Sequence, residues 1–317
     1  ISFARGHSSP MSSLSSPPIS VALGEILWDR FPDEDRFGGA PANFACSVAG
    51  LGRAQVRSVM VGAVGNDPLG EAALRELASR GVDISAIERR DEPTGEVRVT
   101  LDAAGVASYR FAEPVAWDRL TWTPSLESLV AQADLVAFGT LGQRDPVARR
   151  TILRFLDALP SRTIRLLDIN LRPPHWKPET VVESARRADW IKLNDLELPV
   201  VADLFGIGGS ESESAESLLR RLGLRGLALT RGERGSLLIA ADGSRSEWPA
   251  EAVSIVDTVG AGDAFTAALA LGLVHSLPLD AVHRWASRVA SHVCGVAGAN
   301  PPFPASLSLA SFRESLA

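Results

Sequence analysis

From Ile19 onward the chain alternates short apolar runs with longer segments in which apolar residues recur every three or four positions. The short runs are typical of strands buried in a sheet, and the longer periodic segments are typical of helices. Strands and helices that alternate in this way fold into a parallel sheet covered by helices. The pattern therefore predicts one α/β domain over residues 19–317 with a single continuous core.

The segments that carry this pattern can be assigned one by one. Strands of the main sheet are expected at 19–26, 56–64, 135–138, 163–168, 190–193, 227–230 and 236–240. Helices are expected at 41–51, 69–79 and 147–159, after Asn194, and at 261–274 and 279–293. About eight strands are predicted in total. The acidic, glycine-rich segment 206–217 is expected to be a flexible connector.

Two neighbouring segments do not fit the alternation. Glu96–Leu101 and Ser108–Phe111 alternate polar and apolar residues, as half-exposed antiparallel strands do, and a turn at 104–105 separates them. We expect these strands to form a small sheet that stands off the main domain. Such a sheet can be a lid over the cleft at the carboxyl ends of the main strands, or an edge hairpin of the main sheet. The expected lid comprises about 27–37 and 94–112.

Charge and cysteine content narrow the classes of function. The chain has 317 residues and a net charge of −6 without a basic block, so nucleic acid is not an expected partner. Cys46 and Cys294 lie far apart, which argues against a disulfide framework and favours a reducing, cytoplasmic compartment. The uncharged stretches after Asp263 and Arg288 are too short or too rich in proline to cross a membrane. Residues 1–18 are expected to be a flexible tail and not a signal peptide, the alternative being a transit peptide because the segment contains Arg5 and no acidic residue.

The basic residues limit how the protein can hold an anion. All 32 of them except Lys177 and Lys192 are arginines, and neither lysine follows a glycine. A phosphate loop that uses a glycine–lysine pair is therefore excluded. Anion binding must rest on arginine, on backbone N–H groups or on a metal ion.

The most informative run is Asp257-Thr-Val-Gly-Ala-Gly-Asp263, which leads directly into an apolar helix. Glycines allow close approach of the backbone, and the unpaired N–H groups of a helix start attract negative charge. A carboxylate at such a site repels a phosphate, unless its role is to accept a proton from an attacking hydroxyl. The alternative is an Asp favoured by the helix start after a tight turn. A dinucleotide-binding fingerprint is disfavoured because Phe265 stands where a small residue is needed.

This run resembles the D-T-x-G-A-G-D signature of the ribokinase-like sugar kinases, also called the pfkB family. The runs Gly38–Ala45 and Val61–Asp67 resemble the N-terminal signature of that family. The resemblance extends from about residue 19 to about residue 304. It implies a ribokinase-like three-layer α/β sandwich with a mostly parallel central sheet and a small β lid. It also implies an enzyme that transfers a phosphoryl group from ATP to a sugar hydroxyl.

The resemblance further implies roles for residues that match the family's motifs. Asp263 would be the base that takes the proton from the sugar, and the amides of Gly260, Ala261 and Gly262 would form an anion hole. The sugar would bind to Asp29, Gly38, Gly39 and Asn43. The nucleotide would bind to Asn194, Thr230, Gly232 and Gly235. Glu197, three residues after Asn194 and expected on the same helix face, would organise Mg²⁺, and Asp257 lies where some members bind a monovalent cation such as K⁺.

Two runs resemble particular groups within the family. Asp168–Trp176 is similar to the D-x-N-x-R-x-x-x-W run of fructokinases and 2-keto-3-deoxygluconate kinases, and Gly24–Asp29 is closer to the fructokinase opening G-E-x-L-x-D than to that of ribokinase. Arg172 is therefore the candidate for a positive charge near the transferred phosphoryl group, its alternative being a structural ion pair. Asp168 or Asn170 would give polar support.

The preferred function is that of a fructokinase-like sugar kinase, with ATP and the sugar as its partners. The alternatives are a kinase for 2-keto-3-deoxygluconate, ribose or a nucleoside, and a non-catalytic sugar-binding regulator with the same fold. An acid substrate would require a second arginine, for which Arg98, Arg110 and Arg144 are available. No membrane partner is expected. If the lid has an exposed edge, pairing of two lids would produce a homodimer.

Overall fold

The computed structural model describes residues 16–31, 33–101 and 107–316, and these form two separate sheets. The larger sheet consists of β1 (Ile19–Leu23), β4 (Arg57–Gly65), β5 (Asp83–Arg90), β8 (Leu135–Phe138), β9 (Ile164–Asp168), β10 (Trp190–Asn194), β11 (Gly226–Thr230), β12 (Ser236–Ala240) and β13 (Arg245–Trp248). Its strand order is β13-β12-β11-β10-β9-β8-β1-β4-β5. Only β12 runs against its neighbours, so the prediction of a mostly parallel sheet is confirmed.

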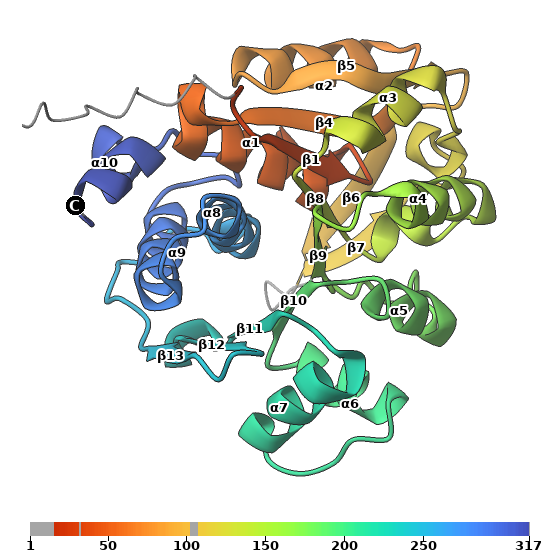
Figure 1. The fold of residues 1–317 in the computed structure, drawn as a ribbon. Helices are drawn as coiled ribbons and strands as arrows, with labels where there is room; N and C mark the ends of the chain where they lie inside the picture. Colours follow the sequence, from red (N-terminus) through yellow and green to blue (C-terminus); the bar gives the residue numbers. More distant parts are fainter. Residues whose placement is uncertain (1–15, 32, 102–106, 317) are drawn as a thin grey trace, which may run out of the picture.

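Helices cover both faces of this sheet (Figure 1). One face carries α3 (Pro124–Gln132), α4 (Pro146–Ala158), α5 (Pro178–Ala185), α6 (Glu197–Leu204) and α7 (Glu211–Leu222). The other carries α1 (Ala40–Gly52), α2 (Pro68–Ser79), α8 (Ala261–Val274), α9 (Leu279–Cys294) and α10 (Leu309–Glu314). Val21 and Leu23 of β1 pack into the first apolar layer, whereas Ala22 packs into the second. This alternation is what a strand buried on both faces requires, and it produces the predicted three layers.

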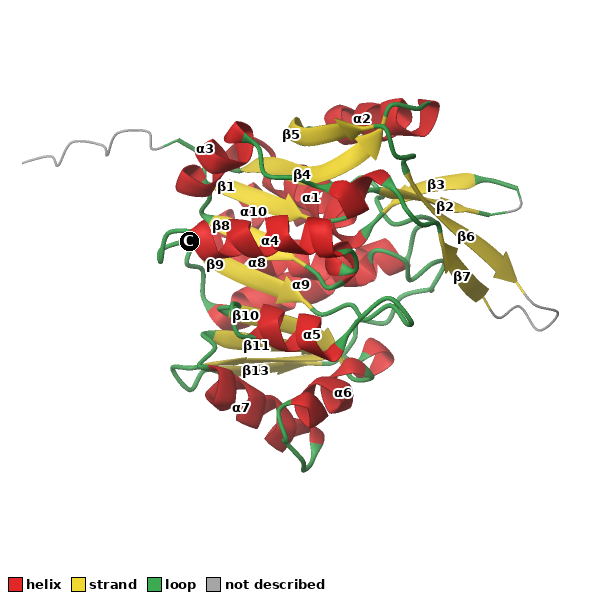
Figure 2. Ribbon diagram, turned by 90° about the vertical axis from the view of Figure 1, so that its right-hand side faces the viewer, coloured by secondary structure: helices red, strands yellow, loops and turns green. Residues whose placement is uncertain are grey.

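The smaller sheet contains β2 (Leu27–Arg30), β3 (Asp35–Gly38), β6 (Gly95–Leu101) and β7 (Ala107–Phe111) in the order β3-β2-β6-β7. Figure 2 shows it beyond the carboxyl ends of the parallel strands. Its strands pair only with one another within the described residues, so the alternative of an edge hairpin on the main sheet is wrong. The expected turn at 104–105 lies outside the described residues, and so does most of the expected tail, residues 1–15.

The strand order reverses at β1. From β1 the chain goes to β4 and β5 on one side, and it then returns to β8 on the other side. The loops that follow β1 and β8 therefore lead away from each other, and such a reversal opens a crevice at the carboxyl ends of the strands. A ligand site is expected there on topology alone.

Several elements differ from the prediction. The main sheet has nine strands instead of about eight, because β5 and β13 at its two edges are too polar to stand out in the sequence. The flexible connector predicted at 206–217 is wrong from Glu211 onward, where α7 begins. The Ser210 hydroxyl accepts the N–H of Glu213, and the Glu213 carboxylate accepts the N–H of Ser210 at 2.8 Å. This reciprocal capping box starts a helix in a segment that composition alone marks as a loop.

No helix in the described part of the chain is long and apolar enough to cross a bilayer.

Candidate active site

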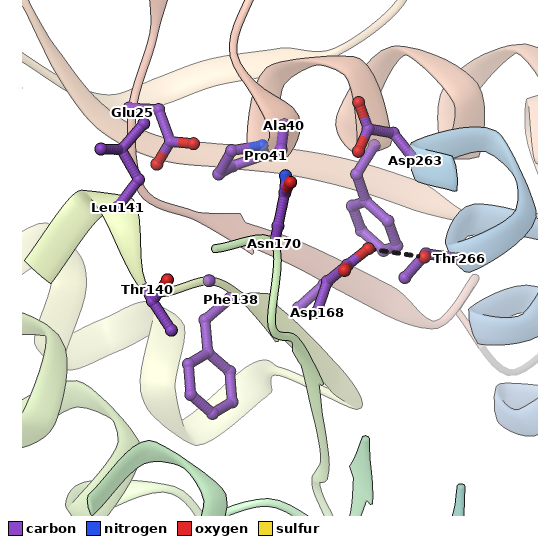
Figure 3. A pocket seen from close by; sticks show the side chains of 13 residues that line it. Glu25, Ala40, Pro41, Phe138, Thr140, Leu141, Asp168, Asn170, Asp263 and Thr266 are labelled. Atoms are coloured by element: carbon purple, nitrogen blue, oxygen red, sulfur yellow. Dashed lines mark hydrogen bonds between the residues drawn. The ribbon is translucent and has the colours of Figure 1, made fainter. Parts of the chain in front are cut away.

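A cavity of about 20 Å³ lies at the point where the strand order reverses. It is lined by Glu25 after β1, by residues 137–141 at the end of β8 and by Asp168 at the end of β9. Pro41 of α1 and Asp263 of α8 close it from the opposite layer (Figure 3). The cavity thus brings together residues from the two signature regions of the sequence.

The start of α8 has the backbone geometry that the glycine run predicted. Gly260 has φ 79°, and an added Cβ would lie 2.4 Å from the carbonyl oxygen of Ala299, so only glycine fits there. The N–H of Ala261 donates to the carbonyl of Thr258 at 3.3 Å. The N–H groups of Gly260 and Gly262 have no acceptor among the described residues. Two of the three amides predicted for the anion hole are therefore available to a ligand, and Ala261 would have to share its N–H.

Asp263 faces the cavity from the first turn of α8 (Figure 3). Its Oδ2 atom accepts a hydrogen bond from Nδ2 of Asn43 at 2.8 Å, and Oδ1 of Asn43 accepts from Nδ2 of Asn300 at 2.7 Å. Burial, together with the nearby charge of Asp168, raises the pKa of Asp263 to about 6, and the Asn43 hydrogen bond partly offsets the rise. A carboxylate with this pKa is ionised at neutral pH and can still accept a proton.

Asn43 and Asn300 fix the Asp263 carboxylate in place. Asn43 was expected to hold the sugar, and that role stays a prediction. In the structure its amide nitrogen is used by Asp263 and its amide oxygen by Asn300. Asn300 could not be identified from the sequence, because its neighbours are the prolines and glycine of an irregular segment.

Sequence reasoning excludes Lys192 as an anion ligand, yet its side chain contacts Asp168, which lines the cavity. Its side chain is only 8% exposed, and its Nζ atom donates to Oδ1 of Asp168 at 3.1 Å. A Cβ on Gly262 would stand 3.1 Å from the same Nζ, so the ammonium lies beside the start of α8. Burial alone lowers the pKa of Lys192, but the carboxylates of Asp168, Glu197 and Asp263 outweigh it and the pKa is raised. The available signal was a lysine inside a buried strand, a place where lysine occurs only when it is paired.

Asp168 also accepts a hydrogen bond from the hydroxyl of Thr266 at 2.9 Å, one turn into α8. Asp168, which was predicted to give polar support, thus accepts hydrogen bonds from Lys192 and from the helix that carries Asp263.

Arg172 projects from the segment after β9 and is exposed. It takes part in none of the ion pairs of the described residues, so the structural ion pair that was its alternative is not found there. Burial raises the pKa values of Glu25, Asp29 and Asp263, and the positive charge of Arg172 partly offsets each rise. Arg172 therefore stands close enough to influence the acids around the cavity.

The residues predicted for the sugar lie side by side. A Cβ on Gly38 would be 3.1 Å from Oδ2 of Asp29, and a Cβ on Gly39, at φ 102°, would be 2.8 Å from the carbonyl oxygen of Glu25. The two glycines thus leave room for the Asp29 carboxylate and for the backbone after β1. Burial raises the pKa of Asp29 to about 6, although Arg172 and Arg36 lower it.

Asn194 and Glu197 do not share a helix face, and that expectation is wrong. Asn194 ends β10, and its Oδ1 atom accepts the N–H groups of Leu196 and Glu197. Glu197 begins α6, and its carboxylate accepts the N–H of Asn194 at 2.9 Å and the N–H of Leu171 at 2.8 Å. The pair forms a reciprocal cap at a strand-to-helix junction, which spacing on a helix cannot reveal.

The other residues predicted for the nucleotide lie at the end of β11. Thr230 is the last residue of that strand, and Gly232 and Gly235 form the turn to β12. Gly235 has φ 85°, and an added Cβ would lie 2.1 Å from the carbonyl oxygen of Trp248. The turn runs next to Asn194, because Thr230 pairs with it in the sheet.

No group of three or more His, Cys, Asp or Glu residues in the described chain is arranged to hold a metal ion. Both oxygens of Glu197 already accept backbone N–H groups. Asp257 accepts the N–H groups of Val259 at 3.0 Å and Gly298 at 3.1 Å, and Arg36 at 3.2 Å. Glu197 and Asp257 fit an ion that is held mainly by phosphate and water, as Mg²⁺ usually is in phosphate sites. A direct ligand role for either of these two acids stays a prediction.

Three comparisons with known proteins identify related chains. The family model described as pfkB family carbohydrate kinase matches residues 33–306. A putative sugar kinase of Pyrococcus horikoshii is 30% identical over 267 residues, which cover 83% of this chain and 81% of that protein. A fructokinase of Klebsiella pneumoniae is 33% identical over 274 residues, which cover 81% and 85% of the two chains. The crystal structure of the P. horikoshii protein in complex with ATP has a TM-score of 0.75 and 29% identity, covering 89% of this chain and 94% of that one.

Proposed function

The chain belongs to the pfkB family of carbohydrate kinases, enzymes that transfer a phosphoryl group from ATP to a sugar hydroxyl, and we propose that its acceptor is a neutral sugar such as fructose. The observation that carries the phosphoryl-transfer function is the Asp263 carboxylate. It stands at the start of a helix with free N–H groups and is fixed by Asn43. A base and an anion site within one helical turn are what direct phosphoryl transfer requires.

The proposed mechanism assigns each charge to a group of this chain. Asp263 takes the proton from the sugar hydroxyl as the hydroxyl oxygen bonds to the terminal phosphorus of ATP, and the bond from that phosphorus to ADP breaks so that ADP leaves. The N–H groups of Gly260 and Gly262, with Lys192 and Arg172, stabilise the negative charge that spreads over the transferring group. Mg²⁺ bound with ATP would neutralise further phosphate charge. Glu197 would help to orient the water molecules bound to that ion. Asp168 keeps Lys192 charged and directed toward the start of α8.

Charge favours a neutral acceptor over an acid. Glu25, Asp29 and Asp263 lie on the acceptor side, and among the described residues Arg172 is the one cation that opposes the rise in pKa of all three. Arg144, one candidate for a second cation, is already paired with Asp118 at 2.7 Å. The other candidates, Arg98 and Arg110, lie exposed on the small sheet. A substrate carboxylate would therefore meet more negative than positive charge.

The nucleotide is proposed to lie along the loop before α8. Large apolar side chains are strongly exposed there, with Ile255 56% and Val256 62% exposed, and Leu196 at the start of α6 is 79% exposed. Exposed apolar groups next to an anion site suit a flat base attached to phosphates. A monovalent cation at Asp257 stays a prediction.

The small sheet is proposed to act as a lid that excludes water during transfer. Arg36 of β3 reaches Asp257 in the loop before α8, so the sheet already contacts the phosphate side of the cleft. The homodimer through the lid and the cytoplasmic location stay predictions.

A substrate screen tests the neutral acceptor. Purified protein with Mg-ATP should release ADP with fructose at a kcat/KM at least about tenfold above that with 2-keto-3-deoxygluconate, since like charges brought together are repelled. Ribose and a nucleoside complete the panel, and a sample without sugar gives the ATPase background. Faster turnover of the acid would overturn the neutral-sugar proposal. Tight sugar binding without ADP release for any sugar would instead favour a non-catalytic regulator.

The pH dependence of kcat, measured with saturating sugar and ATP, tests Asp263 as the base. Because the base must be ionised and its pKa is about 6, activity should be constant above that pH and fall about tenfold per pH unit below it. Asn43→Ala removes a hydrogen bond that stabilises the ionised form, so its acid limb should move to higher pH. An acid limb that Asn43→Ala leaves unchanged would show that another group is titrating.

A further inference from the structure

Glu25 is a buried acid to which the mechanism above gives no task. It follows β1 at the reversal of strand order, where the loops after β1 and β8 lead apart. Ligands of open α/β sheets bind in this crevice. Resting on the proposed function, we propose that Glu25 is a specificity residue of the acceptor site, which accepts a hydrogen bond from a substrate hydroxyl other than the one phosphorylated.

The burial of Glu25 is the first support. Its side chain is only 4% exposed, and its Oε2 atom has no hydrogen-bond partner among the described residues. A buried polar group without a partner is costly, so such groups are satisfied by the protein, by water or by a ligand. Burial also raises the pKa of Glu25 to about 7, and Arg172 opposes that rise. A hydroxyl that donates to Oε2 would satisfy the unpaired atom.

The surroundings of Oε2 leave room for a ligand. Gly142 has no side chain, and it follows directly after the residues at the end of β8 that line the cavity. A Cβ there would stand 3.3 Å from Oε2 and 3.1 Å from Cα of Gly24. In Figure 3 the carboxylate of Glu25 points into the cavity from the side opposite Asp263. A cavity of about 20 Å³ holds roughly one oxygen with its hydrogen atoms, the size of a hydroxyl or a water molecule.

Asn170 supports the same reading from the cavity wall. It has φ 42°, in the left-handed region where asparagine is one of the favoured non-glycine residues. Figure 3 shows its side chain in the cavity between Glu25 and Asp263. Its amide can donate to or accept from a neighbouring hydroxyl. Glu25 and Asn170 together offer a polyol two hydrogen-bonding groups beside the base, which is what discrimination between sugar isomers requires.

The test is a protein–ligand mutant cycle with Glu25→Gln, which keeps the length of the side chain and removes its charge. Calorimetry in the absence of ATP gives Kd for D-fructose and for each of its monodeoxy analogues, with the wild type and with the variant. We expect Glu25→Gln to weaken fructose binding about tenfold or more. One monodeoxy analogue should bind both proteins equally, because the contacted hydroxyl is missing from it. The Kd for ATP and the thermal midpoint serve as controls for folding.

Glu25→Asp is the matched variant, because it keeps the charge but withdraws the oxygens. It should lose the same discrimination between fructose and that analogue, and it replaces Glu25→Gln if the latter does not fold. Glu25→Gln that binds all the sugars as the wild type does, or weakens all of them equally, overturns the role of Glu25 alone. A wild type that neither binds nor phosphorylates any neutral sugar overturns the proposed function and, with it, this inference.

Discussion

Asp263→Asn is expected to lower kcat by about 1,000-fold, within the range that a general base contributes, while the Kd values for sugar and ATP change little. The amide cannot take the proton, yet it has nearly the shape of the carboxylate and can still accept the hydrogen bond that Asn43 donates. The variant also loses a negative charge beside the proposed phosphate site, so ATP binding should not become weaker. Steady-state ADP release measures kcat, and calorimetry measures both Kd values.

Asp203→Asn is the matched control for this experiment. Asp203 is an exposed acid near the end of α6 and takes no part in the site. Its variant should keep wild-type kcat and stability. If Asp263→Asn keeps more than about a tenth of wild-type turnover, Asp263 is not the base. Water or another carboxylate must then accept the proton.

Gly260→Ala is expected to damage both folding and catalysis. The new methyl group would have to stand 2.4 Å from the carbonyl oxygen of Ala299, so the backbone at the start of α8 must move. The N–H groups that form the anion site move with it, and we expect kcat to fall about 100-fold, the loss that follows removal of one such donor. The free energy of unfolding should fall by about 3 kcal/mol, the sum of a positive-φ penalty and a steric clash.

Gly223→Ala separates these two effects. Gly223 has φ 63° and nothing within 4 Å of an added Cβ, so its variant has the backbone penalty without the clash. It should lose about 1 kcal/mol of stability and keep wild-type kcat. Urea unfolding and ADP release measure the two quantities for both variants. Equal losses of stability, with full activity in both, would contradict the geometry described for Gly260.

The fold was predictable where neighbouring residues alone decide the conformation. The strands at 135–138 and 236–240 and the helix at 261–274 were predicted with the bounds that the structure has. The edge strand β5 was missed because D-I-S-A-I-E-R-R is half exposed and carries no clear apolar run. α7 was missed because its capping box depends on one reciprocal pair of hydrogen bonds, which composition does not report.

Only the part of the site that is continuous in the sequence could be predicted. The glycines before α8 and the Asp that follows them form one run, so their local geometry could be inferred from the sequence. Lys192 was misjudged, because its relation to Asp168 and Gly262 comes from the packing of β9 and β10 against α8. Asn43 was matched to a motif for sugar binding, but its hydrogen bonds to Asp263 and Asn300 appear only in the fold.

The sequence by itself determined the α/β alternation, the small separate sheet, the family and the helix start that can bind an anion. These depend on periodicity and on backbone preferences set by residues a few positions apart. Tertiary structure alone decided that Asn43 and Asp263, 220 positions apart, would share a hydrogen bond. It also decided that Lys192 would pair with Asp168 and that an oxygen of Glu25 would be left without a partner. Burial and neighbouring charge set the pKa values of such groups, and both arise only when distant segments pack together.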